Sequence, residues 1–168
     1  MLRRRRPKTK VTSTSYTTIG LGTIAGLRSM AGPALLARAI RGGQLKGLER
    51  TRFMILASPR IQITLQLLMA GEMAADKMSF VPSRTSPPAL LGRALSGALV
   101  GAALFADANR KANHGALLGA FSAIVAAYAG ENLREKGTEG LGAPSPIPAL
   151  LEDMFVLSLG TRLLRKKT

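Results

Sequence analysis

Residues 89–107 read Ala-Leu-Leu-Gly-Arg-Ala-Leu-Ser-Gly-Ala-Leu-Val-Gly-Ala-Ala-Leu-Phe-Ala-Asp, and this stretch decides the fold class. It lacks the alternation of apolar and polar residues that marks a half-buried strand, so a helix is expected. As a helix it would be apolar on nearly every side, which suits a bilayer better than a surface exposed to water.

Three candidate helices carry a pair of glycines spaced four residues apart. The pairs are Gly22 with Gly26, Gly97 with Gly101, and Gly115 with Gly119. In water, each glycine inside a helix costs about 1 kcal/mol relative to alanine. In a bilayer the same spacing lets two helix backbones approach closely. The sequence therefore predicts an integral membrane bundle in which these glycines pack helices together.

Further apolar stretches flank this one, and all are expected to be helices because 46% of the residues are apolar and only 4% aromatic. They lie near 17–40, 54–75, 89–107, 114–131 and 147–164. None is an uninterrupted run of about 20 apolar residues, and the mean hydropathy is only +0.17. The fold class expected is thus an all-α, polytopic membrane bundle, with four and five helices both open.

Prolines and glycines divide these stretches. Pro88 and Pro148 are expected in the first turns of helices, where proline is tolerated. Pro33 lies inside an apolar stretch and is expected to kink or break it. Polar, glycine-rich loops are expected at 41–52 and 137–148.

Two short motifs recur in alternation along the chain. Pro-Ala-Leu-Leu begins at Pro33, Pro88 and Pro148, and Gly-Glu-x-x-x-acid-Lys begins at Gly71 and Gly130. Each repeat unit is long enough for two helices and their connections. Units of two spans keep the same orientation, so we expect parallel two-helix repeats.

The net charge of +15 is concentrated near the start of the chain, because residues 1–60 contain 13 Lys or Arg and a single acid. We expect residues 1–16 to be a basic, disordered, cytoplasmic tail, residues 17–164 the bundle domain, and residues 165–168 a basic C-terminal end. The tail begins with Arg3, Arg4, Arg5 and Arg6. Anionic lipid head groups are its expected partners. Nucleic acid is disfavoured because no aromatic residues or RNA-binding signature accompany the arginines.

The composition also limits the chemistry. The chain has no cysteine and one histidine, His114, which excludes thiolate metal sites and histidine clusters. We therefore expect no metal, no cofactor and no catalytic residue. One enzymatic alternative is a lipid-modifying protein in which Asp76-Lys77 and Ser83-Arg84-Thr85 hold a phosphate.

Ionisable residues within the apolar stretches require an explanation, because each costs roughly 3 kcal/mol at membrane depth unless it pairs or faces the interior. We predict that they form a polar seam between the repeats. Its candidate members are Arg28, Arg38, Glu72, Asp76, Arg84, Arg93, Glu131, Glu152 and Asp153. Arg28 and Arg93 are the natural counter-charges for the glutamates.

Several of these residues belong to motifs that together resemble one family. The motifs are Gly26-Leu27-Arg28-Ser29 before Pro33, Glu72-x-x-x-Asp76-Lys77, Pro82-Ser83-Arg84-Thr85, Arg93 with Gly97 and Gly101, and Glu152-Asp153. Over roughly residues 17–164 the chain resembles the bacterial membrane proteins grouped as domain-of-unknown-function family 4126. The resemblance implies a small multi-pass protein of the bacterial inner membrane, and it implies no reaction or substrate.

Two functions fit a charged seam. One is a channel or secondary transporter for a small ion or polar solute, with Pro33 supplying a broken helix. The other is a non-catalytic scaffold, or an assembly or regulatory subunit, in which the charges lock helices together. A homo-oligomer is compatible with both. The tetra-arginine tail favours a cytoplasmic amino terminus.

Overall fold

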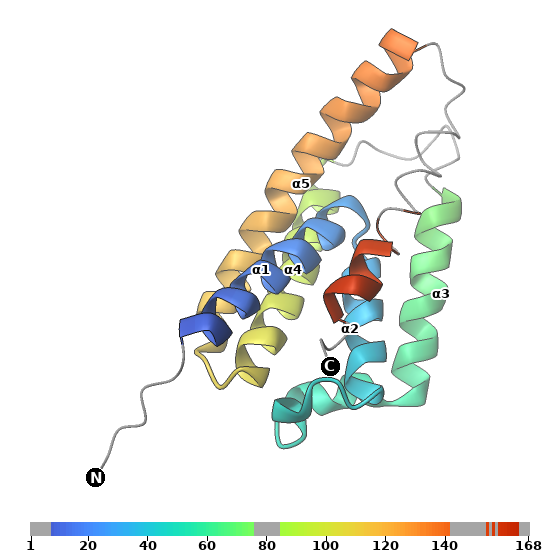
Figure 1. Cartoon of the computed structure of the whole chain (residues 1–168). Helices are drawn as coiled ribbons and strands as arrows, with labels where there is room; N and C mark the ends of the chain where they lie inside the picture. Colours follow the sequence, from blue (N-terminus) through green and yellow to red (C-terminus); the bar gives the residue numbers. More distant parts are fainter. Residues whose placement is uncertain (1–7, 76–84, 142–153, 155, 157, 165–168) are drawn as a thin grey trace.

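The computed structural model describes residues 8–75, 85–141, 154, 156 and 158–164. The elements in this part of the chain are all helical, which confirms the all-α prediction (Figure 1). The α-helices are α1 (Lys8–Leu27), α2 (Ala31–Arg41), α3 (Pro59–Ala75), α4 (Pro87–Asp107) and α5 (Ala112–Leu141), and two short 3₁₀ helices, η1 (Lys46–Leu48) and η2 (Arg52–Ala57), lie between α2 and α3.

The first apolar stretch forms two helices, because α1 ends at Leu27 and the chain turns back into α2. The expected break exists, but it precedes Pro33. Pro33 is the third residue of α2, a position in the first turn where its missing N–H costs no helical hydrogen bond. Pro87 and Pro88 likewise open α4, as expected for Pro88.

Helix α1 begins at Lys8, so residues 8–16 are helical and not a disordered tail. Threonine and serine weakly oppose helix formation because their hydroxyls compete for backbone groups. Here the Thr18 hydroxyl instead donates to the carbonyl oxygen of Thr14, one turn earlier, at 2.9 Å. This bond leaves the helical ladder intact.

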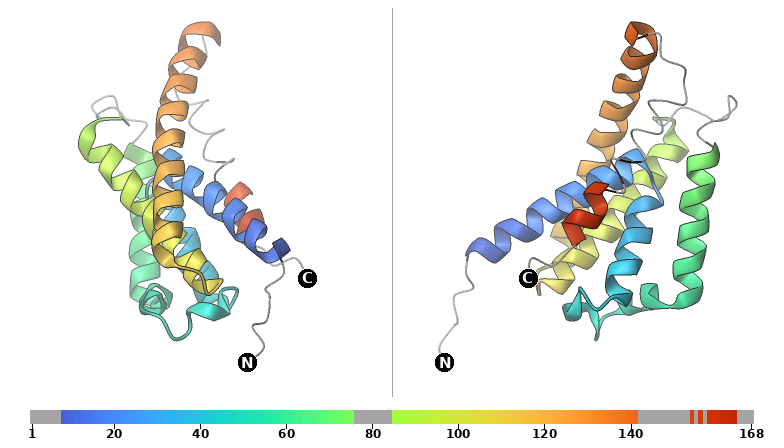
Figure 2. Two further views of the ribbon diagram at one scale, coloured as in Figure 1. Left: turned by 90° about the vertical axis from the view of Figure 1, so that its left-hand side faces the viewer. Right: turned by 45° about the vertical axis from the view of Figure 1, so that its right-hand side comes forward.

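Helix α5 is longer than its apolar stretch. It continues to Leu141, through the polar residues after position 131 and into the segment expected to be a loop. No proline occurs within its 30 residues, so nothing in the covalent chain forces an earlier end. Its C-terminal turns extend beyond the amino-terminal end of α4 (Figure 2).

Helices α4 and α5 form an antiparallel pair in direct backbone contact. A Cβ atom on Gly97 would clash with the Gly119 carbonyl oxygen, and one on Gly101 would clash with that of Gly115. In turn, a Cβ atom on Gly119 would clash with the Gly97 carbonyl oxygen, and one on Gly115 would clash with that of Gly101. No side chain therefore fits between the helices at these four positions.

Helix α1 packs across this pair (Figure 2), and its Gly22 and Gly26 contact α5. A Cβ atom on Gly22 would lie 2.8 Å from the Gly119 carbonyl oxygen. One on Gly26 would clash with the Ala123 carbonyl oxygen. The structure thus places all six glycines of the Gly-x-x-x-Gly pairs at contacts among α1, α4 and α5.

The C-terminal helical residues 158–164 cover α1 and α2. Leu163 packs on Gly20 of α1, and Gly160 packs on Leu35 of α2. Val156 just before them is fully buried in the main core.

Helices α2 and α4 run in one direction in Figure 1, and α3 and α5 return in the other.

These contacts predict that alanine is not tolerated at Gly101. The Gly101→Ala variant should lower the free energy of unfolding by about 1–3 kcal/mol, because an extra methyl group must push α4 away from α5. Thermal unfolding of the purified chain, followed by circular dichroism, measures this.

The matched control is Gly92→Ala in the same helix, where a Cβ atom meets nothing within 4 Å. This variant should keep or raise the melting temperature, because alanine favours the helix. Equal melting temperatures for the two variants would contradict the close packing of α4 on α5.

Candidate functional site

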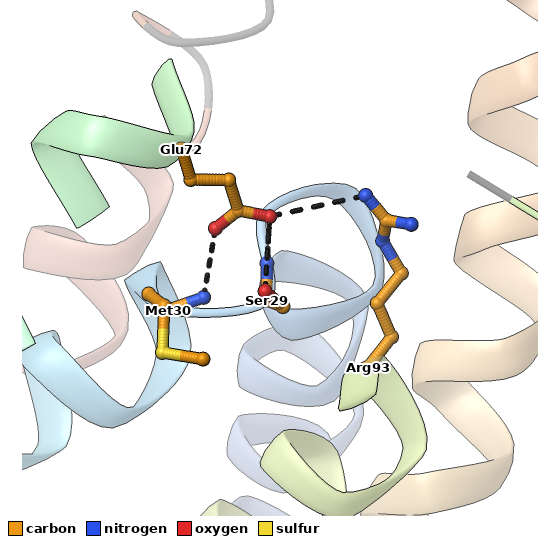
Figure 3. Close-up of polar contacts among 4 residues, drawn as sticks. All are labelled: Ser29, Met30, Glu72 and Arg93. Carbon is orange, nitrogen blue, oxygen red and sulfur yellow. Dashed lines mark hydrogen bonds and ion pairs between the residues drawn. The ribbon is translucent and has the colours of Figure 1, made fainter. Parts of the chain in front are cut away.

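The carboxylate of Glu72, in the last turns of α3, meets the turn that joins α1 to α2 (Figure 3). Its Oε1 atom accepts hydrogen bonds from the Ser29 amide, at 2.8 Å, and from the Ser29 hydroxyl, at 3.0 Å. Its Oε2 atom accepts one from the Met30 amide at 2.9 Å. One side chain thus binds a turn 42 residues away in the sequence.

The local sequence explains why the turn needs this partner. Met30 is the N-cap residue of α2, and its side chain makes no capping hydrogen bond. The amides that precede a helix have no acceptor within it and need one elsewhere. The positive end of the helix dipole also favours a negative charge at this place. Glu72 therefore caps α2 from a different helix.

A cation from a third helix completes the arrangement. The Nη2 atom of Arg93, on α4, lies 3.8 Å from Glu72 Oε1. The side chains of Arg93 and Glu72 are 6% and 16% exposed. A carboxylate so far from water requires such compensation. The group formed by Ser29, Met30, Glu72 and Arg93 is called the Glu72 cluster below.

Arg28 lies next to this cluster in the chain and is fully buried. Its amide still donates to the Ile24 carbonyl oxygen, at 2.8 Å, so it directly follows the last helical residue of α1. A buried guanidinium is costly and is retained where it is hydrogen-bonded or paired. The α1–α2 turn thus holds one buried cation while α4 supplies another.

The structure brings Glu72 and Arg93 together but does not bring Arg38 or Glu131 to them. Arg38 is exposed near the other end of α2, where it lines an open pocket of about 440 Å³. Arg38 is the eighth residue of α2, about 10 Å along the helix from its first residue, so it does not join Glu72 and Arg93. Glu131 is half-buried on α5. The other members proposed from the sequence lie outside the described residues: Asp76, Arg84, Glu152 and Asp153.

Ser29 and Met30 are not recognisable from the sequence as partners of Glu72. The bonds that matter are mostly to backbone amides, which no residue type reveals. A usable signal was the absence of Ser, Thr, Asp or Asn at the N-cap position of α2, which leaves that position without its usual local cap.

The Glu72 cluster is suited to joining helices. Both of its carboxylate oxygens accept hydrogen bonds from the α1–α2 turn, Oε1 from Ser29 and Oε2 from Met30. His114 is exposed at the start of α5. In the ranges that the structure describes, no three His, Asp or Glu side chains gather to hold a metal ion.

Comparison with known proteins places the whole bundle in one family. Residues 16–164 match the model of a domain of unknown function, DUF4126. The chain belongs to the DUF4126 family. This confirms the resemblance and shows that α2, α3, α4 and the Glu72 cluster all lie within the family's domain. No curated protein and no solved structure matches this DUF4126 chain.

The geometry predicts that Glu72→Ala destabilises the fold by about 3–5 kcal/mol, the cost of breaking a buried charge pair. The variant leaves the Arg93 guanidinium without its carboxylate and two turn amides without their acceptor. Thermal or denaturant unfolding in detergent measures the loss.

Glu49→Ala is the matched control, because Glu49 is exposed and its loss should change the free energy of unfolding by less than about 0.5 kcal/mol. A double-mutant cycle with Arg93→Met isolates the pair. The account fails if Glu72→Ala costs no more than Glu49→Ala.

Proposed function

We propose that this DUF4126 chain is a multi-pass membrane bundle that acts as a non-catalytic scaffold or assembly subunit. The observation that carries the membrane part is the apolar character of the outer surface. The core is mostly apolar and also buries Thr18, Arg28, Gln62, Arg93, Ser96 and Ser122. Many large apolar side chains nevertheless lie outside.

Ten of the exposed large apolar side chains lie on α3, α4 and α5. They are Ile63, Leu67 and Leu68 on α3, Leu91 and Leu95 on α4, and Leu117, Phe121, Val125, Tyr128 and Leu133 on α5. Large exposed apolar side chains on several helices are unfavourable in water and indicate a surface that another apolar phase covers. We infer that the hydrocarbon chains of lipid cover them.

Two helical segments support the same conclusion by length. Pro87–Asp107 and Ala112–Leu133 are, within the described residues, the ones long and apolar enough to cross a membrane. The first has 21 residues, or about 30 Å of helix, the thickness of the hydrocarbon layer. Only 44% and 33% of their most apolar windows are buried in the bundle, whereas a core helix of a water-soluble protein is mostly covered.

The Glu72 cluster supports a scaffold role. A transport site must exchange its ligand, yet here the carboxylate is engaged by Ser29, Met30 and Arg93 of the chain itself. The glycine contacts bring α1, α4 and α5 together without intervening side chains. Both features rigidify the bundle.

One observation favours transport as the second candidate. The break between α1 and α2 lies beside the buried Glu72 and Arg93, and discontinuous helices at charged sites are typical of secondary transporters.

Embedding in the bilayer is tested with Leu117→Trp, because the chain has no tryptophan and Leu117 is 72% exposed on α5. In vesicles of lipids brominated on the acyl chains, its fluorescence should be strongly quenched. Lys136→Trp, at an exposed position in the polar C-terminal turns of α5, is the polar control and should be quenched much less. Equal quenching at both positions would contradict the proposed arrangement.

Flux measurements separate the scaffold from the transporter. Proteoliposomes containing the wild-type chain should pass Na⁺, K⁺, Cl⁻ and protons no faster than protein-free vesicles. Glu72→Gln should leave this background unchanged. A flux that the wild-type chain supports and Glu72→Gln abolishes, with equal amounts of protein inserted, would instead establish transport.

A further inference from the structure

The connection between α2 and α3 combines a dense positive charge with exposed apolar side chains. Between positions 38 and 60 the six basic residues are all exposed, and Glu49 is the only acid. The six are Arg38, Arg41, Lys46, Arg50, Arg52 and Arg60. Met54 and Ile55, within η2, are 43% and 66% exposed.

The connection between α2 and α3 packs firmly on the bundle. The fold therefore fixes the positions of its exposed basic and apolar side chains. Leu48 is fully buried and Leu56 nearly so, which turns one side of η1 and η2 into the core. The Gly47 amide donates to Asp107 Oδ1 at 2.8 Å, which ties η1 to the end of α4. A Cβ atom on Gly47 would clash with the Asp107 backbone, so only glycine allows this contact.

We propose that η1, η2 and the ends of the flanking helices form an interfacial element that binds anionic phospholipid head groups. The proposal rests on the membrane bundle proposed above and adds the class of lipid and the surface that binds it. Basic residues beside exposed Met and Ile match a surface that attracts the head groups and inserts into the acyl boundary.

The interfacial element lies at the end of the bundle where exposed basic residues give way to exposed apolar ones, as expected at a membrane interface. On α3, exposed Arg60 lies in the first turn, and exposed Ile63 and Leu67 follow one and two turns later. On α5, exposed Lys111 just precedes the helix and exposed Leu117 follows. Both helices begin at the end of the bundle that holds η1 and η2 (Figure 1).

An open pocket beside the element offers a place for a head group. It measures about 440 Å³ and is lined by Leu35, Arg38, Ala39, Gln44, Thr161 and Leu164. Arg38, Gln44 and Thr161 supply donors that suit a phosphate oxygen. The leucines supply apolar walls for the start of an acyl chain.

The charge also orients the bundle. Basic connections are retained on the cytoplasmic side of membranes, where the leaflet is anionic. The amino-terminal end of α1 lies at the same end of the bundle as η1 and η2 (Figure 1). Both therefore face the cytoplasm. The negative phosphates of nucleic acid would be attracted by the same cations, but exposed Met54 and Ile55 contribute nothing to that contact.

The experiment uses the full chain with Ile55→Trp as the sole tryptophan, reconstituted in vesicles of phosphatidylcholine alone or with phosphatidylglycerol. The lipids are brominated near the acyl ester. Quenching should be about twofold stronger with phosphatidylglycerol, and salt should reduce this difference. Replacing Lys46, Arg50 and Arg52 by Gln should abolish it.

A second charge variant serves as the control, with Arg3, Arg4, Arg5 and Arg6 replaced by Gln. It removes more charge but leaves the element intact, so the difference between lipids should persist. The proposal is overturned if the difference in quenching between the two lipids survives in the Lys46, Arg50 and Arg52 variant, or if it disappears in the tail variant. It is also overturned if lipid charge leaves the Ile55→Trp signal unchanged and an added oligonucleotide changes it.

Leu117→Trp separates this proposal from the one on which it rests. If the signal from position 117 is quenched in both lipids while that from position 55 ignores lipid charge, only the head-group surface is wrong. If the signal from position 117 is not quenched, the membrane bundle itself is wrong.

Discussion

The hydrogen bonds from the Ser29 and Met30 amides to Glu72 are the interaction on which the rest of the bundle depends. A chain that turns back inside a bundle exposes amides that have no helical acceptor, and at membrane depth no water replaces one. A carboxylate satisfies two amides at once but introduces a charge. Arg93 compensates that charge, so a single turn fixes the positions of α3 and α4 relative to α1 and α2.

The glycine contacts hold α1, α4 and α5 together elsewhere in the bundle. Gly97 and Gly101 lie on the α5 backbone, while Leu91 and Leu95 of α4 and Leu117 and Phe121 of α5 lie on the outer surface. The result is a closely packed interior that is mostly apolar and buries a few polar side chains, an apolar outer surface and a cationic end. These three features suit the interior of a protein, the hydrocarbon layer and an anionic head-group layer in turn.

The sequence predicts much of this where a residue type carries the physical constraint. Pro88 marks a helix start because proline fits only there, and opposite charges at Glu72 and Arg93 invite pairing. Three features depend on information that residue types do not carry. The chain breaks at residues 28–30 and not at Pro33, because a first-turn proline costs nothing. Residues 8–16 are helical because they continue the part of α1, around Gly22 and Gly26, that packs on α5. Glu72 binds backbone amides, and these are the same in every sequence.

Amide hydrogen exchange at Ser29 and Met30 tests the central claim most directly, in the wild-type chain and in Glu72→Ala reconstituted in lipid nanodiscs. In the wild-type chain both amides should be protected about as well as the helical amides of α2. In Glu72→Ala they should exchange much faster, while the amides at the Gly97 and Gly101 contacts keep their protection. Rapid exchange of Ser29 and Met30 in the wild-type chain, or unchanged protection in Glu72→Ala, would contradict the account.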